Sequence, residues 1–401
     1  LQMLVSTIDY DDYVGRIAVG KIERGRIEVG QEALLCGHGE DSTGVRITNL
    51  YLFDGLKRIP ASQAKAGDIV AVSGVEGINI GDTICHVDHP EPLPFANISK
   101  PTMSMTFSVN TSPFTGQDGR YVTSRNLRDR LFRERYIDVS LEVEETDSPD
   151  SFKVSGRGEL HLAILIENMR RQGYEFQVSK PTVIYQTIDG STHEPMERVL
   201  VDVPDSFMGT VIEKLGERKG EIISMGENKG GRIRLEFTIP ARGLFGYQTE
   251  FMTDTRGEGI LNSVFDGYQP YKGAIPTRQQ GVLIASEKGE AVTYGLHNAQ
   301  ERGILFIEPG MPVYEGMVVG QNHRLGDIEV NVCRKKHVSN MRAAGADEAL
   351  RLFPARNLTL EQALEFISDD ELLEITPNSI RIRKTILDPV QRMRLNRRNK
   401  S

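Results

Sequence analysis

The order strand, helix, strand, strand, helix, strand occurs twice along this chain and constrains the fold more than any other sequence feature. Residues 102–180 show it first, with two helical segments between apolar or alternating strand runs, and residues 197–275 show it again. In the helix expected at 159–172, the apolar positions are Leu160, Ile164 and 166–169. This β-α-β-β-α-β order is the split motif of ferredoxin-like domains. We therefore expect two small α+β domains in series.

The residues before the first of these units predict a β-barrel. Short apolar or alternating runs between residues 2 and 95 are bounded by glycine, and Gly15, Gly20, Gly25 and Gly30 recur every five residues. No helix holds that spacing, whereas tight turns and bends between short strands do. The proline-rich stretch at 89–94, at the end of this region, predicts a stiff exit linker.

Residues from 280 onward predict a further domain. The runs 281–285 and 291–296 flank a short charged turn and predict a hairpin, and a capping box at 359–362 opens a helix. A length of 401 residues suits two to four domains. The expected fold is multidomain β and α+β: a β-barrel at 1–95, ferredoxin-like domains at 100–180 and 181–279, and a mainly β C-terminal domain with a helix at 280–401.

Motifs for catalysis are missing from the sequence. The one Gly-Lys pair, Gly20-Lys21, is followed by isoleucine, so there is no phosphate-binding loop of the type Gly-x-x-x-x-Gly-Lys-Ser/Thr. The possible metal ligands between Cys85 and His89 are too close together to close a tetrahedron easily. For the chain as given we therefore predict no enzymatic activity, no catalytic residue, no metal site and no cofactor.

Charge is distributed unevenly along the chain. The net charge is −8, yet the last 21 residues hold eight Lys or Arg and only one Asp. Arg381 and Arg383 alternate with isoleucine, so we expect both on the solvent face of a strand. The end of the chain, with Arg397 and Arg398, is either a disordered basic tail or an arm that orders on RNA.

A second basic segment precedes this tail. Arg334, Lys335 and Lys336 are followed by small and polar residues that include Asn340 and Arg342, without apolar periodicity. One interpretation is a solvated charged loop. The other is a nucleic-acid contact, in which Lys and Arg bind phosphates while Asn340 and Arg342 hydrogen-bond bases or ribose.

Several strings resemble translation factors. Residues 15–22 and 66–74 look like the second-domain barrel of translational GTPases, 154–162 like the third domain of elongation factor G, and 242–247 like its fifth domain. A different domain follows at about 280 and contains Asn340-Met341-Arg342-Ala343. With that arrangement, essentially the whole chain is similar to the TypA/BipA family.

The resemblance implies a ribosome-bound factor acting in translation under stress, in large-subunit assembly, or both. Its expected partners are both ribosomal subunits, ribosomal RNA and A-site tRNA, without a membrane and as a monomer in the bacterial cytosol or an organelle stroma. GTP and Mg²⁺ are expected in an N-terminal GTPase domain that this sequence lacks. The RNA- and tRNA-binding candidates are Arg334, Lys335, Lys336, Asn340, Arg342, Arg381, Arg383, Arg397 and Arg398.

An alternative of a different class stays open at this point. Paired ferredoxin-like domains could form the small-molecule regulatory module of a metabolic enzyme. That hypothesis leaves the barrel strings and the basic tail unexplained. Thermal-shift screening with amino acids and nucleotides would separate the two hypotheses.

Overall fold

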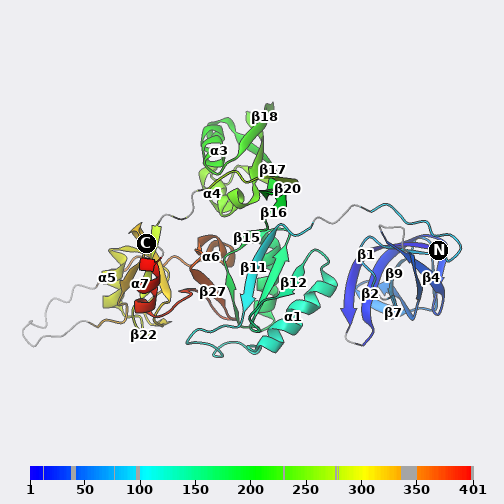
Figure 1. Ribbon diagram of the computed structural model, residues 1–401, viewed down its shortest axis with the longest axis horizontal. Coiled ribbons are helices and arrows are strands. Elements are labelled where there is room, and N and C mark those ends of the chain that lie inside the picture. The colour runs from blue at the N-terminus through cyan, green and yellow to red at the C-terminus, as the bar shows by residue number, and fades with distance from the viewer. Residues whose placement is uncertain are drawn as a thin grey trace, which may run out of the picture. The chain divides into compact units, whose positions relative to one another are not determined.

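The fold is taken from a computed structural model, which separates into two compact bodies. The first holds Leu1–Pro101 with Arg128–Glu144, and the second holds Thr102–Leu127 with Glu145–Ser401. Each body is described by itself (Figure 1). The structure describes residues 1–11, 13–37, 42–75, 77–95, 100–228, 231–275, 278, 280–335 and 350–398.

The first body contains the predicted barrel of short antiparallel strands. Its main sheet has the order β5-β4-β10-β1-β2-β9-β6-β7, and β3 pairs with β8. The interior is aliphatic, with Met3, Val5, Ile22, Val70 and Val72 fully buried. The strands are β1 Gln2–Asp11, β2 Gly15–Arg24, β3 Arg26–Glu28, β4 Glu32–Cys36, β5 Ser42–Arg46, β6 Asn49–Asp54, β7 Lys57–Pro60, β8 Gln63–Lys65, β9 Ile69–Ser73 and β10 Thr83–Cys85.

The four evenly spaced glycines serve two purposes. Gly15, Gly25 and Gly30 have φ of +74°, +75° and +84°, a conformation that favours glycine. Gly20 instead lies inside β2, where an added Cβ would come within 2.0 Å of the Leu4 carbonyl oxygen. The predicted turns are thus confirmed at three positions, and the fourth allows close strand packing.

The first ferredoxin-like unit contains the predicted six elements, with strand order β12-β13-β11-β14. Its helix α2 buries Leu162, Leu165, Ile166 and Met169, whereas Leu160 is exposed. Leu160 was expected on the apolar face, so that part of the prediction is wrong. The elements are β11 Met103–Ser108, α1 Ser124–Ile137, β12 Glu142–Glu145, β13 Ser151–Gly156, α2 Glu159–Arg171 and β14 Phe176–Ser179, and β15 Thr182–Val183 also pairs with β11.

Two strands from far along the chain extend this sheet. β27 (Glu371–Ile375) pairs with β14, and β28 (Ile380–Lys384) pairs with β27. We expected residues 280–401 to form a domain of their own, but residues 371–384 complete the sheet of the first ferredoxin-like unit. Leu373 and Ile375 are fully buried, so this addition contributes apolar surface to the core.

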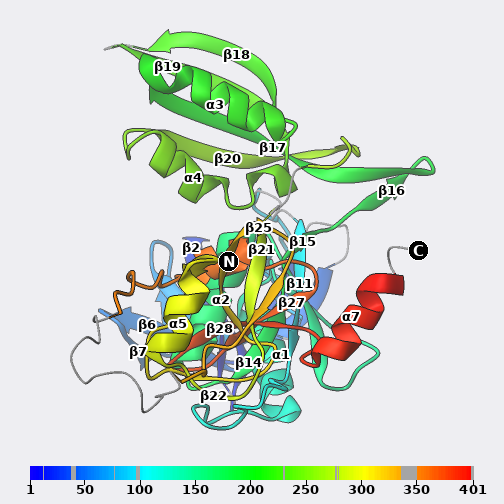
Figure 2. The ribbon, with the colours of Figure 1, turned by 90° about the vertical axis from the view of Figure 1, so that its left-hand side faces the viewer.

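The second ferredoxin-like unit repeats the same strand order, β18-β19-β17-β20, with β16 added beside β17. Helices α3 and α4 cover one face of its sheet, where Val201, Val211, Leu215, Phe237 and Phe251 form the core (Figure 2). The elements are β16 Gln186–Ile188, β17 Ser191–Pro204, α3 Asp205–Glu217, β18 Glu221–Asn228, β19 Arg232–Pro240, the 3-10 helix η1 Ala241–Leu244, α4 Tyr247–Asp254 and β20 Ile260–Pro270.

The C-terminal module, residues 280–335, is built on the sheet β23-β25-β21-β26. The predicted hairpin strand at 291–296 is wrong, because helix α5 begins at Thr293 and buries Leu296 and Ala299. Gly295 lets α5 approach Val332, whose carbonyl oxygen would lie 2.3 Å from an added Cβ. The elements are β21 Gln280–Ala285, β22 Gly289–Glu290, α5 Thr293–Gln300, β23 Gly303–Leu305, β24 Pro312–Val313, β25 Val318–Leu325 and β26 Ile328–Val330.

Helix α6 (Leu360–Phe366) begins at the predicted capping box. The Thr359 hydroxyl accepts from the Gln362 backbone N–H, and the Gln362 side chain accepts from the Thr359 N–H. Replacing Thr359 by alanine should lower the free energy of unfolding by about 1 kcal/mol. Urea titration followed by circular dichroism measures this, with Thr359→Ser as the control that keeps the cap. Equal stability of the alanine variant would contradict a capping role.

Candidate nucleic-acid interface

The predicted basic loop is only partly covered by the structure. Arg334 and Lys335 follow β26 and are both exposed. Lys336, Asn340 and Arg342 lie outside the described residues, so their role as RNA- and tRNA-binding candidates stays a prediction from the sequence. Two cations of the predicted set therefore stand on the surface of the C-terminal module next to this loop.

The basic tail contains a helix, α7 (Pro389–Arg398). Arg397 and Arg398 are exposed on it. Arg392 anchors the start of the helix, since its guanidinium forms an ion pair with Glu329 in β26 at 2.5 Å. It also donates to the Ile386 carbonyl oxygen at 2.6 Å. The ion pair connects α7 to the strand that precedes Arg334 and Lys335.

Arg394 is a further candidate that is not among the RNA-binding residues predicted from the sequence. It is exposed on α7, three residues before Arg397 and four before Arg398. Residues at these spacings lie on neighbouring positions of a helix surface. The spacing 394, 397, 398 was the available signal, but it has meaning only once the segment is known to be helical.

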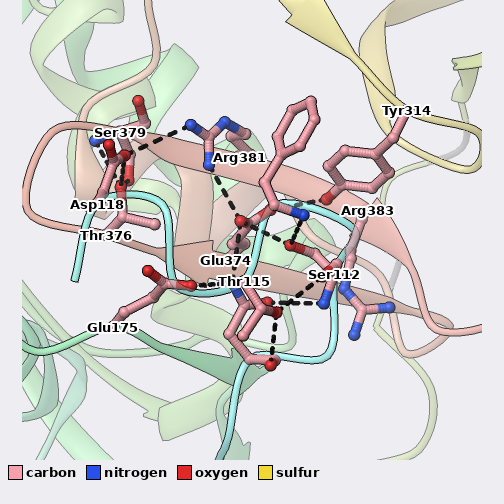
Figure 3. A network of polar contacts seen from close by, with 12 residues as sticks. Ser112, Thr115, Asp118, Glu175, Tyr314, Glu374, Thr376, Ser379, Arg381 and Arg383 are labelled. Atoms are coloured by element: carbon pink, nitrogen blue, oxygen red, sulfur yellow. Dashed lines mark hydrogen bonds and ion pairs between the residues drawn. The ribbon is translucent and has the colours of Figure 1, made fainter. Parts of the chain in front are cut away.

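Arg381 does not lie on a solvent face, and that expectation is wrong. Its side chain is only 13% exposed. Its guanidinium donates to Glu374 at 3.0 Å and lies 3.7 Å from Asp118. It also stacks over the Phe114 ring, 5.3 Å from the centroid. These contacts make Arg381 part of an internal polar network instead of a surface ligand (Figure 3).

Arg383 is buried even more deeply, with 2% of the residue exposed. Its guanidinium donates to Thr111 Oγ1 at 2.7 Å and to Gln177 Oε1 at 2.5 Å. Burial lowers the pKa of Arg383, while Tyr314 and Glu374 oppose that shift. The alternation correctly placed Arg381 and Arg383 on one face, but that face is covered by the loop after β11 and by the C-terminal module.

Glu374 is the centre of this network (Figure 3). The carboxylate is fully buried. One oxygen accepts from Asn110 Nδ2, Ser112 Oγ and Arg381 Nη1 at 3.0, 2.9 and 3.0 Å, and the other accepts from the Tyr314 hydroxyl at 2.7 Å. Burial and the neighbouring Glu374 raise the pKa of Tyr314, so its phenol stays a donor. Three parts of the chain thus meet at one carboxylate.

A second group of buried charges lies at the end of β28. Lys384 is 2% exposed and lies within 2.9 Å of Asp327, Asp370 and Glu371. Glu371 also accepts two hydrogen bonds from Arg278, at 2.8 and 3.1 Å. Neighbouring carboxylates raise the pKa of Lys384 against the opposing effect of burial, so the amine stays charged. Together with Arg392, which anchors α7, the buried cations Arg381, Arg383 and Lys384 make four of the eight tail cations that serve the fold.

The exposed cations of this region suit electrostatic binding to an anionic partner. The exposed cations Arg334, Lys335, Arg394, Arg397 and Arg398 can contact phosphates through charge and hydrogen bonds. Within the described residues, no three His, Cys, Asp or Glu side chains gather in a way that could hold a metal ion. In the same part of the chain, no helix combines the length and apolarity that crossing a bilayer requires.

Three regions of the chain match known protein families. Residues 280–389 match the TypA/BipA C-terminal domain, residues 191–279 match the elongation factor G C-terminus, and residues 15–85 match elongation factor Tu domain 2. The Bacillus subtilis protein named large ribosomal subunit assembly factor BipA is 51% identical over 402 residues, covering 100% of this chain and 66% of the relative. This chain belongs to the TypA/BipA family.

Other relatives of the TypA/BipA family agree with this assignment. The Synechocystis protein of the same name is 49% identical over 96% of this chain and 64% of its own length. The Salmonella typhimurium protein is 47% identical over 100% of this chain and 66% of its own length. The chain thus spans about two thirds of the length of the curated relatives it matches. A crystal structure from Thermus thermophilus aligns with a TM-score of 0.43 at 18% identity, over 68% of this chain and 56% of that one, which is too little to support an argument.

The family assignment agrees with the predicted fold class. The barrel region matches a translation-factor barrel, and the second ferredoxin-like unit matches a translation-factor domain. Membership of TypA/BipA favours a translation-related role over the regulatory module of a metabolic enzyme.

Proposed function

We propose that this chain is the ribosome- and RNA-binding part of a TypA/BipA-type translational GTPase that docks at the A-site region of the ribosome. Its role is in translation under stress, in assembly of the large ribosomal subunit, or in both. The observation that carries the proposal is the match of the whole chain to relatives named large ribosomal subunit assembly factors.

The exposed cations of the C-terminal part support this proposal. Arg334, Lys335, Arg397 and Arg398 remain from the predicted set, and Arg394 joins them. Lys336, Asn340 and Arg342 remain as predictions for contacts with RNA or with the tRNA in the A site. Arg381 and Arg383 are left out as RNA ligands, because their guanidinium groups are used inside the protein.

On this proposal, nucleotide binding and ribosome binding belong to different parts of the parent protein. GTP and Mg²⁺ would be bound by a GTPase domain of the parent protein, outside this sequence. This chain would supply a shape that fits the ribosome and contacts with ribosomal RNA of both subunits. It would act as a monomer in the bacterial cytosol or an organelle stroma. On this proposal, the residues described above take no part in GTP hydrolysis.

Cosedimentation with purified 50S subunits and 70S ribosomes tests the proposal. The chain should pellet with them at about 50 mM salt and be released progressively as salt rises, because phosphate contacts displace condensed counterions. The measured quantity is the bound fraction at each salt concentration, with bovine serum albumin as the non-binding control. Failure to pellet at low salt, with the GTPase part restored to the chain, would contradict ribosome binding.

A further inference from the structure

The segment 350–358, called the strap below, is held against the C-terminal module beside β23. Gln300 at the end of α5 contacts it twice. Its Nε2 donates to the Arg351 carbonyl oxygen at 2.9 Å, and its Oε1 accepts from the Phe353 backbone N–H at 3.0 Å. Further along, the Arg356 backbone N–H donates to a carbonyl oxygen of β23 at 2.8 Å. These hydrogen bonds fix the backbone of the strap along an end strand of the sheet.

An aromatic side chain of the strap lies on the surface of the module. Leu352 packs against the core, whereas its neighbour Phe353 is 70% exposed. Ile304 in β23 and Leu325 at the end of β25 are exposed as well. Single exposed apolar side chains are ordinary. An exposed ring on a fixed backbone, however, loses little conformational freedom when a flat partner stacks on it.

Three exposed arginines lie in the segments around this ring. They are Arg302 in the turn between α5 and β23, Arg324 at the end of β25, and Arg351 in the strap. The His323 backbone N–H donates to the Arg302 carbonyl oxygen at 2.9 Å, which places the end of β25 beside that turn. Within the part of the chain that the structure describes, none of the three guanidinium groups forms a hydrogen bond or an ion pair.

Positive charge dominates these segments. Residues 300–305, 321–325 and 351–356 contain four arginines and one acidic residue, Glu301. The first carboxylate after β25 belongs to Asp327, which is paired with Lys384 at 2.6 Å. Free cations beside an exposed aromatic ring are the combination that binds single-stranded nucleic acid, because the cations bind phosphates while the ring stacks on a base.

We propose that Arg302, Arg324, Arg351 and Phe353, called the β23 surface below, bind a single-stranded stretch of RNA. One base stacks on the Phe353 ring, and the neighbouring phosphates bind the three arginines. The bases of an A-form duplex are stacked inside the helix, so the ring gains a partner only from an unpaired nucleotide. The inference deepens the proposed function, on which it rests for the identity of the polyanion as RNA.

The β23 surface is separate from the cations of α7. Helix α7 is tied to β26 through the ion pair of Arg392 with Glu329, and Arg334 and Lys335 follow β26 in the chain. In the sheet order β23-β25-β21-β26, β23 and β26 are the two end strands. The C-terminal module therefore offers RNA two contacts, one at each edge of its sheet.

A single tryptophan in the β23 surface tests the proposal on the full chain. The chain contains no tryptophan, so Phe353→Trp introduces the one indole, and the three α7 arginines are replaced by alanine to remove the competing contact. Single-stranded RNA of about 8 nucleotides should quench the indole emission in a saturable way at low salt, because a base stacks on the ring. The duplex of the same sequence should quench it much less. Phe53→Trp, at an exposed phenylalanine of β6 in the barrel, is the matched control and should keep its emission.

Two variants in the same background separate the ring from the cations. Replacing the three arginines of the β23 surface by alanine should weaken binding of the single strand by about 10- to 100-fold, and should make its salt slope shallower by about 2. Replacing Phe353 by alanine, with binding followed by anisotropy of labelled RNA, should weaken it by about 5- to 100-fold at an almost unchanged salt slope. Far-UV circular dichroism checks that each variant is folded.

The outcomes distinguish this inference from the proposed function. Emission of the Phe353→Trp chain that does not respond to single-stranded RNA, or responds equally to the duplex, would overturn the β23 surface even if the parent chain cosediments with 50S subunits. Selective quenching without cosedimentation would support the surface and count against ribosome binding. A blue shift of the emission with vesicles of anionic phospholipid, without a response to RNA, would overturn the inference in favour of a lipid surface.

Discussion

Replacing Glu374 by alanine should lower the free energy of unfolding by about 3–5 kcal/mol. The substitution leaves the nearly buried guanidinium of Arg381 without its closest anion. It also takes the acceptor from Asn110, Ser112 and the Tyr314 hydroxyl. Buried donors left without a partner each carry a desolvation cost, so the losses accumulate at one position.

Urea titration followed by far-UV circular dichroism suits this measurement, because the chain contains no tryptophan for fluorescence. Glu308→Ala removes an exposed carboxylate and should change the free energy of unfolding by less than about 0.5 kcal/mol. Tyr314→Phe should cost about 1–2 kcal/mol, and the double variant with Glu374→Ala should cost less than the sum, because both remove the same hydrogen bond. A Glu374→Ala chain as stable as Glu308→Ala would show that the network does not hold these segments together.

Replacing Arg394, Arg397 and Arg398 together by alanine should weaken binding to ribosomal RNA by about 10- to 100-fold at low salt. All three side chains are exposed on α7, where they can reach phosphates. The slope of log affinity against log salt should become shallower by about 2 to 3, since each lost phosphate contact removes roughly 0.7 to 0.9.

The matched control keeps the charge and changes only the side chain. Replacing the same three arginines by lysine should retain the salt slope, because counterion release depends on charge. Affinity is measured by filter binding with a ribosomal RNA fragment at several salt concentrations. An alanine variant that binds with the parental slope would place the RNA contacts elsewhere on the chain.

The sequence predicted the architecture well where local patterns carry the information. Both ferredoxin-like units, the barrel of short strands and the capping box at Thr359 depend on periodicity and on turn chemistry within short segments. Leu160 and the segment at 291–296 were misassigned for a related reason. An apolar residue alone does not show whether another part of the protein covers it. A short apolar run alone does not show whether the periodicity of a helix or of a strand continues.

The candidate site was harder to predict because burial of a charge depends on distant segments. The alternation from Ile380 to Arg383 shows that two arginines share a face, but not which face meets solvent. That face is covered by Tyr314 and by the loop around Ser112, which lies more than 260 residues earlier in the chain. Counting tail charges therefore overstated the exposed positive surface, and the helical spacing of α7 identified the part that remains.

Photocrosslinking from α7 tests the central claim most directly, namely that the basic C-terminal part of this chain contacts ribosomal RNA. Benzoylphenylalanine at Met393, which is 57% exposed on α7, is irradiated in the complex with 50S subunits, and the crosslinked species are sequenced. We predict crosslinks to ribosomal RNA, and we expect them to decrease when Arg394, Arg397 and Arg398 are replaced by alanine. A chain that cosediments with the subunit yet crosslinks from Met393 to no RNA would contradict it.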